Sequence, residues 1–80
     1  MLVGEEDFDA ALITLGEAQG PCVVDTETTG LRPFHGDRIC GIGVRIGDVR
    51  RYFPFRHGEG PNLPESFIPA VWDTLKLHTR

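Results

Sequence analysis

The sequence predicts a small α/β or α+β fold in which a helix, three strands and a second helix follow one another. Three observations support this expectation. A segment near each end of the chain places apolar residues at helical spacing, and three apolar segments with strand-like composition lie between them. Gly47-Asp48, between the second and third of these segments, is typical of a two-residue hairpin turn. We therefore expect an antiparallel three-stranded meander with helices packed on it.

The first helix is expected over residues 5–18. Its apolar residues follow an i, i+3, i+4, i+7 pattern and share one helical face: Phe8, Ala11, Leu12 and Leu15. Acidic residues at positions 5–7 favour the positive end of the helix dipole. The helix ends before Gly20-Pro21, because proline cannot continue it.

Residues 22–27 are predicted to form a buried strand, because apolar and β-branched residues dominate it up to a polar loop. Residues 38–46 and 49–55 should form the second and third strands, and Pro54 suits the end of an edge strand. Gly41 and Gly43 alternate on one face of the second strand, as expected where another element approaches the backbone closely. The first helix is the expected neighbour.

A second helix is expected to close the chain. Asn62 is a candidate N-cap with Glu65 at the third position. The residues that follow form an apolar stripe at helical spacing: Phe67, Ile68, Val71, Trp72 and Leu75. The whole chain, residues 1–80, is therefore read as a single domain.

Composition narrows the class of protein. The net charge is -4 and the pI is near 5.2, so any contact with nucleic acid must come from a local site rather than from a broadly basic surface. Cys22 and Cys40 lack the spacing of a zinc site or a disulfide scaffold and are expected to be reduced. No apolar run approaches the roughly 20 residues of a membrane helix. We expect a cytoplasmic protein with no membrane contact.

Asp25 and Glu27 are the main candidates for chemistry. They stand two apart in a predicted strand, so both carboxylates point to one face, about 7 Å apart along the chain. A divalent cation would compensate their repulsion, and hard oxygen ligands suit Mg²⁺ or Mn²⁺. This pattern favours phosphoryl chemistry. The alternative is that Asp25 caps a turn while Glu27 lies in solvent at the strand end.

The longer segment Val23–Leu31, with its Asp-Thr-Glu-Thr-Thr-Gly-Leu string, resembles the first exonuclease motif of the DnaQ-like (DEDD) 3′–5′ exonucleases. The segment Tyr52–His57 is similar to the third strand of the proofreading domain of family A, DNA polymerase I-type, polymerases. The resemblance covers most of the 80 residues but only the first half of that domain. It implies a truncated ribonuclease H-like fold and a role in DNA replication.

The resemblance also implies roles for individual residues. Asp25 would bridge two Mg²⁺ or Mn²⁺ ions and Glu27 would ligate one of them, making these the catalytic and metal-binding residues. Thr28 and Leu31 would contact the 3′-terminal nucleotide of single-stranded DNA. The reaction would be phosphodiester hydrolysis by two-metal catalysis. A polymerase domain downstream is the implied partner.

The second and third motifs of the family, with the other two carboxylates and a Tyr or His, are missing from these 80 residues. Asp73 is interpreted as a solvated helix residue. His35 and His57 are candidates for a replacement base, but each is expected in a loop or at a strand end, and a non-catalytic role is favoured for both. We therefore expect the isolated chain to be inactive. The alternative is a non-catalytic nucleic-acid-binding or regulatory module that keeps only the first motif.

The first strand would also lack the parallel strand that pairs with it in the family. Its free edge would then be unprotected, so we expect the chain to be marginally stable or to self-associate through this edge.

Overall fold

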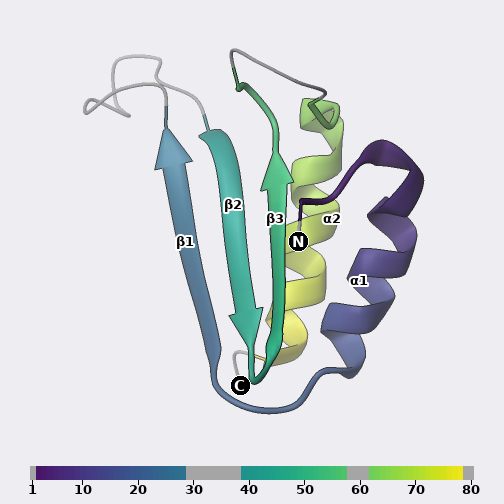
Figure 1. The fold of residues 1–80 in the computed structure, drawn as a ribbon, viewed down its shortest axis with the longest axis vertical. Helices are drawn as coiled ribbons and strands as arrows, with labels where there is room; N and C mark the ends of the chain where they lie inside the picture. Colours follow the sequence, from purple (N-terminus) through teal and green to yellow (C-terminus); the bar gives the residue numbers. More distant parts are fainter. Residues whose placement is uncertain (1, 29–38, 58–61, 79–80) are drawn as a thin grey trace.

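The structure is a computed structural model that describes residues 2–28, 39–57 and 62–78. These residues form a small α+β unit with two α-helices and a three-stranded antiparallel sheet, as predicted (Figure 1). The chain order is α1 (Phe8–Glu17), β1 (Cys22–Thr28), β2 (Ile39–Ile46), β3 (Val49–Pro54) and α2 (Ile68–Leu75). Short 3-10 turns lie at Glu5–Asp7, Glu65–Phe67 and Lys76–His78.

The sheet has the order β1-β2-β3, and the turn at Gly47-Asp48 joins β2 to β3 as the sequence predicts. Gly47 has a φ of 58°, in the left-handed region that favours glycine. A side chain there would also collide with the carbonyl oxygen of Gln19. The turn is therefore specific to glycine for two independent reasons.

Both helices pack on the face of the sheet that carries Ile42, Val44 and Phe53. In Figure 1, α2 passes behind β3 and α1 lies beside it. The centre of the core is formed by fully buried side chains from both layers: Val3, Leu15, Ile42, Ile46, Phe53 and Val71. Phe8 of α1 makes an edge contact with Phe53, with ring centroids 5.9 Å apart. Among the described residues, no helix packs on the opposite face of the sheet, which is called the open face from here on.

The prediction that residues 22–27 form a buried strand is wrong. The strand forms, but Val23 is 58% exposed and Val24 is 39% exposed, on opposite faces. The physical reason is the position of β1, which lies at the sheet edge beside β2, while the helices cover β2 and β3 (Figure 1). The apolar residues Val23 and Val24 of β1 are thus exposed to solvent on the two faces of the sheet.

The two outer edges of the sheet differ. The N-terminal segment lies along β3, where the Val3 amide donates to the Tyr52 carbonyl at 2.8 Å and Leu2 forms an isolated parallel bridge with Tyr52. Among the described residues, no strand pairs with the outer edge of β1. The free edge that the sequence predicts for the first strand is present in this part of the chain.

The prediction that α1 approaches Gly41 and Gly43 is also wrong. These glycines are on the open face, away from the helices, and the group that lies over Gly41 is the phenol ring of Tyr52. A Cβ at position 41 would overlap that ring, whereas one at position 43 would make ordinary contacts. The glycine pattern therefore marks a close approach by a side chain of the neighbouring strand.

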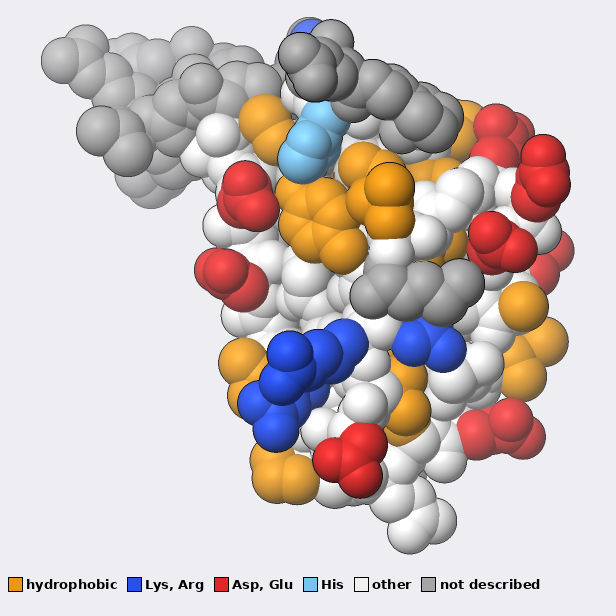
Figure 2. Space-filling view, in the orientation of Figure 1, with side chains coloured by type: hydrophobic (Ala, Val, Ile, Leu, Met, Phe, Trp, Pro, Cys, Tyr) orange, Lys and Arg blue, Asp and Glu red, His pale blue; other side chains and the backbone are white. Residues whose placement is uncertain are grey.

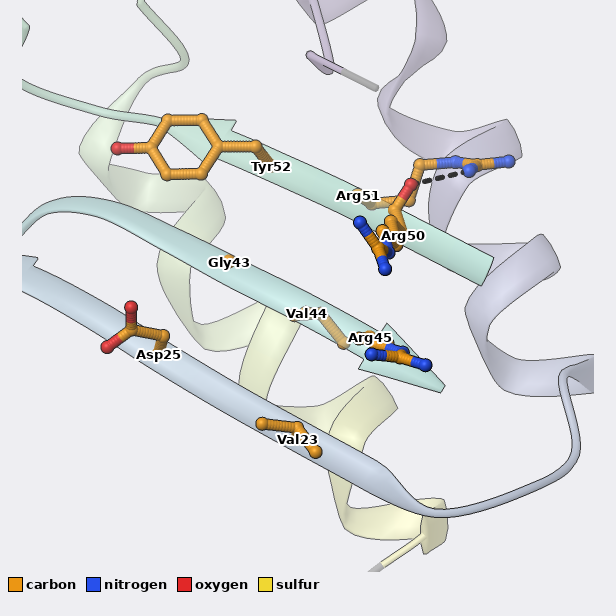
Figure 3. Close-up of a pocket in the computed structure, with 8 residues that line it drawn as sticks. All are labelled: Val23, Asp25, Gly43, Val44, Arg45, Arg50, Arg51 and Tyr52. Atoms are coloured by element: carbon orange, nitrogen blue, oxygen red, sulfur yellow. Dashed lines mark hydrogen bonds between the residues drawn. The ribbon is translucent and has the colours of Figure 1, made fainter. Parts of the chain in front are cut away.

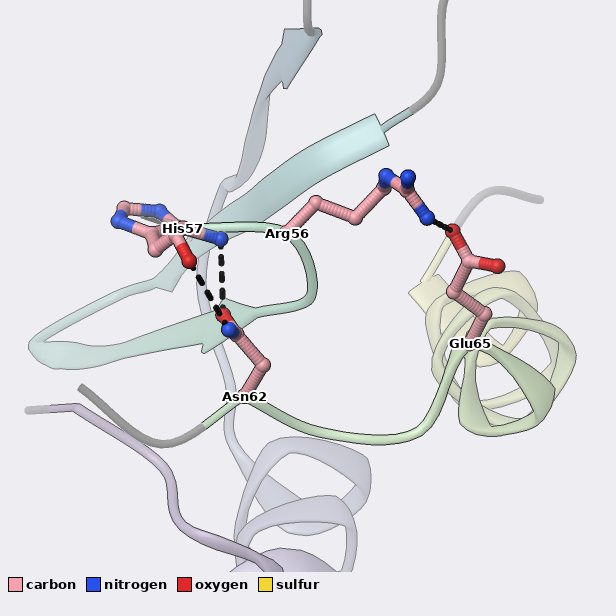
Figure 4. Close-up of polar contacts among 4 residues, drawn as sticks. All are labelled: Arg56, His57, Asn62 and Glu65. Atoms are coloured by element: carbon pink, nitrogen blue, oxygen red, sulfur yellow. Dashed lines mark hydrogen bonds and ion pairs between the residues drawn. The ribbon is translucent and has the colours of Figure 1, made fainter. Parts of the chain in front are cut away.

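Asn62 does not act as the predicted N-cap. Pro64 is extended, so the helical segment begins after it, and neither helical start there has a side-chain cap. The Asn62 side chain instead accepts from the His57 amide at 2.8 Å and donates to the His57 carbonyl at 3.0 Å (Figure 4). Arg56 and Glu65 form an ion pair at 2.9 Å nearby (Figure 4).

Two further expectations concern whole-chain properties. Cys22 and Cys40 are half-buried and are not joined in a disulfide. Within the described ranges, no helix combines the length and the apolar character needed to cross a bilayer.

Candidate functional site

The candidate site lies on the open face of the sheet. The strand register places Asp25 opposite Gly43 and Glu27 opposite Gly41, so both carboxylates lie on the same side of β1, as the sequence predicts. Thr26 pairs with buried Ile42 and therefore belongs to the other side. Because Gly43 has no side chain, the backbone of β2 forms a low floor beside Asp25 (Figure 3).

Tyr52 of β3 reaches across this floor toward β1. Its hydroxyl lies 3.3 Å from Glu27 Oε1, a contact that joins the two outer strands of the sheet. The glycine at position 41 makes the contact sterically feasible, because any larger residue there would occupy the place of the phenol ring. The Tyr52 hydroxyl thus orients the Glu27 carboxylate by donating a hydrogen bond to it.

His57 adds a third member to this cluster. Its Nε2 lies 2.6 Å from the Tyr52 hydroxyl, and the two rings meet edge to face with centroids 5.4 Å apart. A phenol has one proton to donate, so when it donates to Glu27 the imidazole must donate to the phenol oxygen through Nε2–H. The chain of donors then runs from His57 to Tyr52 to Glu27.

The electrostatics of the cluster favour a neutral phenol. Burial raises the pKa of Tyr52, and the negative charge of Glu27, with the hydrogen bond to it, raises it further. At neutral pH Tyr52 therefore keeps its proton and acts as a donor. His57 reaches this position because Asn62 holds both polar groups of its backbone (Figure 4).

Asp25 is exposed on the open face, and no ion pair between described residues involves Asp25 or Glu27. Their oxygens are hard donors, which suit Mg²⁺ or Mn²⁺. Within the described ranges, no group of three or more His, Cys, Asp or Glu residues could hold a metal ion. The donor set that the structure describes is thus a pair of carboxylates, enough for a cation that keeps several waters.

The other residues singled out from the sequence are distributed as follows. Thr28 is the exposed last residue of β1 and pairs with Ile39 after an irregularity in the register. Leu31 and His35 lie outside the described residues. Asp73 lies on the exposed surface of α2, 3.4 Å from Lys76, as expected for a solvated helix residue.

Sequence reasoning missed the role of Tyr52. The segment Tyr52–His57 drew attention only as a resemblance, and no local pattern connects a tyrosine with a carboxylate 25 positions earlier. The available signal was Gly41, because a glycine within a strand leaves room for a large neighbour on the same face.

Comparison of the chain with protein-family models found no match, and comparison with curated protein sequences found none either.

Proposed function

We propose that this chain is the N-terminal part of a ribonuclease H-like 3′–5′ exonuclease domain of the DnaQ-like type, in which Asp25 and Glu27 ligate Mg²⁺ or Mn²⁺. The observation that carries the proposal is the placement of both carboxylates on one exposed, glycine-floored face of the sheet. The substrate is the 3′ end of a single DNA strand, and the bond hydrolysed is a phosphodiester. A polymerase domain downstream would be the partner.

The charge arrangement supports metal binding at this place. Two carboxylates about 7 Å apart along one strand repel each other, and no ion pair of the described residues neutralises them. A divalent cation satisfies both and keeps water in its remaining positions. When bound, such a cation activates water and stabilises the leaving oxygen.

Tyr52 supports the proposal through the geometry of Glu27. Its hydroxyl donates to one carboxylate oxygen, Oε1, and leaves the other oxygen available to a cation. Because the phenol stays protonated, it orients the carboxylate without adding a competing negative charge. In this proposal Tyr52 is a positioning residue, and Thr28 and Leu31 are the proposed contacts to the terminal nucleotide.

The fold is compatible with this assignment. A three-stranded antiparallel meander with both helices on one face corresponds to the first half of a ribonuclease H-like sheet. The free edge of β1 is the place where the next, parallel strand of that fold would pair. The remaining metal ligands of the family belong to motifs that these 80 residues do not contain.

The direct test is Mn²⁺ binding measured by calorimetry on the wild-type chain and two variants. Asp25→Asn removes a proposed ligand, whereas Asp48→Asn makes the same change in charge at the exposed hairpin turn. We expect the first variant to lose about tenfold or more in affinity and the second to match the wild type. Equal affinities for the two variants would contradict the proposal.

A 5′-labelled single-stranded oligonucleotide with Mn²⁺ tests the chemistry. We expect the isolated chain to bind the metal but leave the DNA uncut. A 3′-end ladder that disappears with Asp25→Asn would support the exonuclease assignment and make the expected inactivity wrong. The reading frame after Arg80 separates the remaining alternatives: an Asn-x-x-x-Asp-like segment supports the enzyme, and a stop codon supports a non-catalytic binding module.

A further inference from the structure

Two arginines face each other on the open side of the sheet. Arg45 of β2 is directly opposite Arg50 of β3 in the register, and both side chains are exposed. Figure 3 shows the two guanidinium groups on the same side as Asp25 and Tyr52. Figure 2 shows this face with acidic side chains at its left border and a cluster of basic side chains next to them.

This pairing of like charges is unfavourable by itself. Like charges directly opposite each other on neighbouring strands destabilise a sheet. The ion pairs between described residues are Arg56–Glu65 and Lys76–Asp73, so neither relieves the repulsion. Arg45 donates from Nε to the Gly47 carbonyl at 3.2 Å, which orients its guanidinium without neutralising it. An anion bound between the two arginines would remove the repulsion.

The arginines also line a groove. Its volume is about 240 Å³, and its lining residues are Val23, Asp25, Gly43, Val44, Arg45, Arg50, Arg51 and Tyr52. Arg51 pairs with buried Val44, so its side chain belongs to the other face of β3. Asp25 and Tyr52 lie toward one end of it and the arginine pair toward the other (Figure 3). The register sets the two ends two residues apart along the strands, or about 7 Å.

The chemistry of the groove matches a nucleotide. Guanidinium groups bind phosphate oxygens through paired, charge-assisted hydrogen bonds. The glycine floor, Val23 and the Tyr52 ring offer apolar and aromatic surface to a sugar or base. The chain has a net charge of -4, so a phosphate must find its attraction in a local site such as this one.

We infer that Arg45 and Arg50 form a phosphate-binding subsite for the single strand whose 3′ end lies at Asp25 and Glu27. The inference rests on the proposed function for the identity of the strand. The subsite holds a backbone phosphate on the 5′ side of the bond to be cut, while the carboxylate end repels phosphate unless a cation is bound. The DNA strand therefore runs along the groove with its 5′ side at the positively charged arginine pair and its 3′ end at the two carboxylates.

The experiment is fluorescence anisotropy of a labelled single-stranded oligothymidylate, with EDTA present so that metal binding plays no part. Arg50→Gln and Arg45→Gln are compared with Arg51→Gln, which makes the same charge change at the next residue. Arg51 is a matched control because it points toward α1 and donates to the Arg50 carbonyl at 2.7 Å (Figure 3).

We expect each subsite variant to weaken binding about tenfold at low salt, and Arg51→Gln to weaken it less than about threefold. The slope of log affinity against log salt should fall by about 0.7 in magnitude for the loss of one phosphate contact. Equal losses at positions 50 and 51 would overturn the inference, since they would reflect net charge alone. Arg45→Lys with Arg50→Lys, which keeps the charge, should bind at intermediate strength.

Two further arms distinguish the possible failures. Displacement of the oligonucleotide by inorganic phosphate at equal phosphate concentration would assign the subsite to free phosphate and overturn the strand assignment. Asp25→Asn should not weaken binding in EDTA, because it removes a negative charge. The effect of Asp25→Asn on Mn²⁺ binding tests the proposed function alone. The effect of Arg50→Gln on oligonucleotide binding in the presence of EDTA tests the subsite alone.

Discussion

At the scale of single residues, the site depends on Tyr52, whose side chain extends over Gly41 of the neighbouring strand to reach Glu27. Tyr52 lies over Gly41, and its hydroxyl contacts both Glu27 and His57. It is the only tyrosine in the chain, so the ultraviolet absorbance of phenolate reports this one group. Its environment can therefore be measured directly.

The first prediction concerns this titration. Burial and the charge of Glu27 raise the pKa of Tyr52 above the ordinary phenol value of about 10. Replacing Glu27 with Gln removes the negative charge, so the pKa should fall toward that ordinary value. Spectrophotometric titration of both proteins checks the shift, with Asp48→Asn as the control. An unchanged midpoint in Glu27→Gln would mean that the two side chains are not in contact in solution.

The same shift predicts a dependence of stability on pH. Because the folded state holds the phenol proton more tightly than the unfolded state, the contribution of Tyr52 is complete below about pH 10 and is lost as pH rises through the folded pKa. Tyr52→Phe should lack this loss. Urea unfolding at neutral and at alkaline pH measures it. The difference in unfolding free energy between the wild type and Tyr52→Phe should therefore change with pH. An equal difference at neutral and at alkaline pH would contradict the raised pKa of Tyr52.

A pair of glycine variants tests the steric argument. Gly41→Ala would place a methyl group within the Tyr52 ring, so the ring must move and the contact with Glu27 must break. Gly43→Ala makes only ordinary contacts, at 3.6 Å to the Asp25 carbonyl and 3.7 Å to the Tyr52 ring. We expect the Tyr52 pKa to fall in the first variant only. A fall of equal size in both would show that strand packing in general, rather than Gly41, places the ring.

At the scale of elements, β1 is the exposed one. Its outer edge is unpaired in the described part of the chain, and Val23 and Val24 are exposed on its two faces. Unpaired apolar edges are templates for pairing with another chain. Self-association through β1 is therefore the expected behaviour of the chain at high concentration.

Analytical ultracentrifugation checks this prediction. Val24→Lys places a charge on the exposed edge strand, away from the groove, and should shift the chain toward monomer. Ile13→Lys is the matched control, because Ile13 is an apolar residue of α1 that is 62% exposed. The control should associate like the wild type. If the wild type remains a monomer over a wide concentration range, the prediction fails.

At the scale of the whole molecule, stability comes from a thin core between the helices and β2–β3. A chain of this length has an expected unfolding free energy of about 4–12 kcal/mol. Phe53 is fully buried at the centre of that core and contacts Phe8. The surface ion pair Arg56–Glu65 is 42% exposed at both side chains, so it contributes at most about 1 kcal/mol.

These magnitudes predict a clear contrast. Phe53→Ala should lower the free energy of unfolding by about 3–5 kcal/mol. The variant should therefore be almost completely unfolded at the urea concentration at which half of the wild-type chain is unfolded. Glu65→Gln should lower it by less than about 1 kcal/mol. Urea titrations followed by circular dichroism measure both. Comparable losses would place the stability in the surface contacts instead of in the core.

The sequence by itself determined the order and approximate bounds of the helices and strands and the hairpin turn at Gly47-Asp48. It also determined the shared face of Asp25 and Glu27. These features are local, because helical spacing, strand alternation and turn chemistry act between residues close together in the chain. Only the tertiary structure decided that β1 is exposed on both faces, that Tyr52 covers Gly41 and that Arg45 is opposite Arg50. Such contacts depend on strand register and on which strands the helices cover, and both are set by long-range packing that local patterns do not encode.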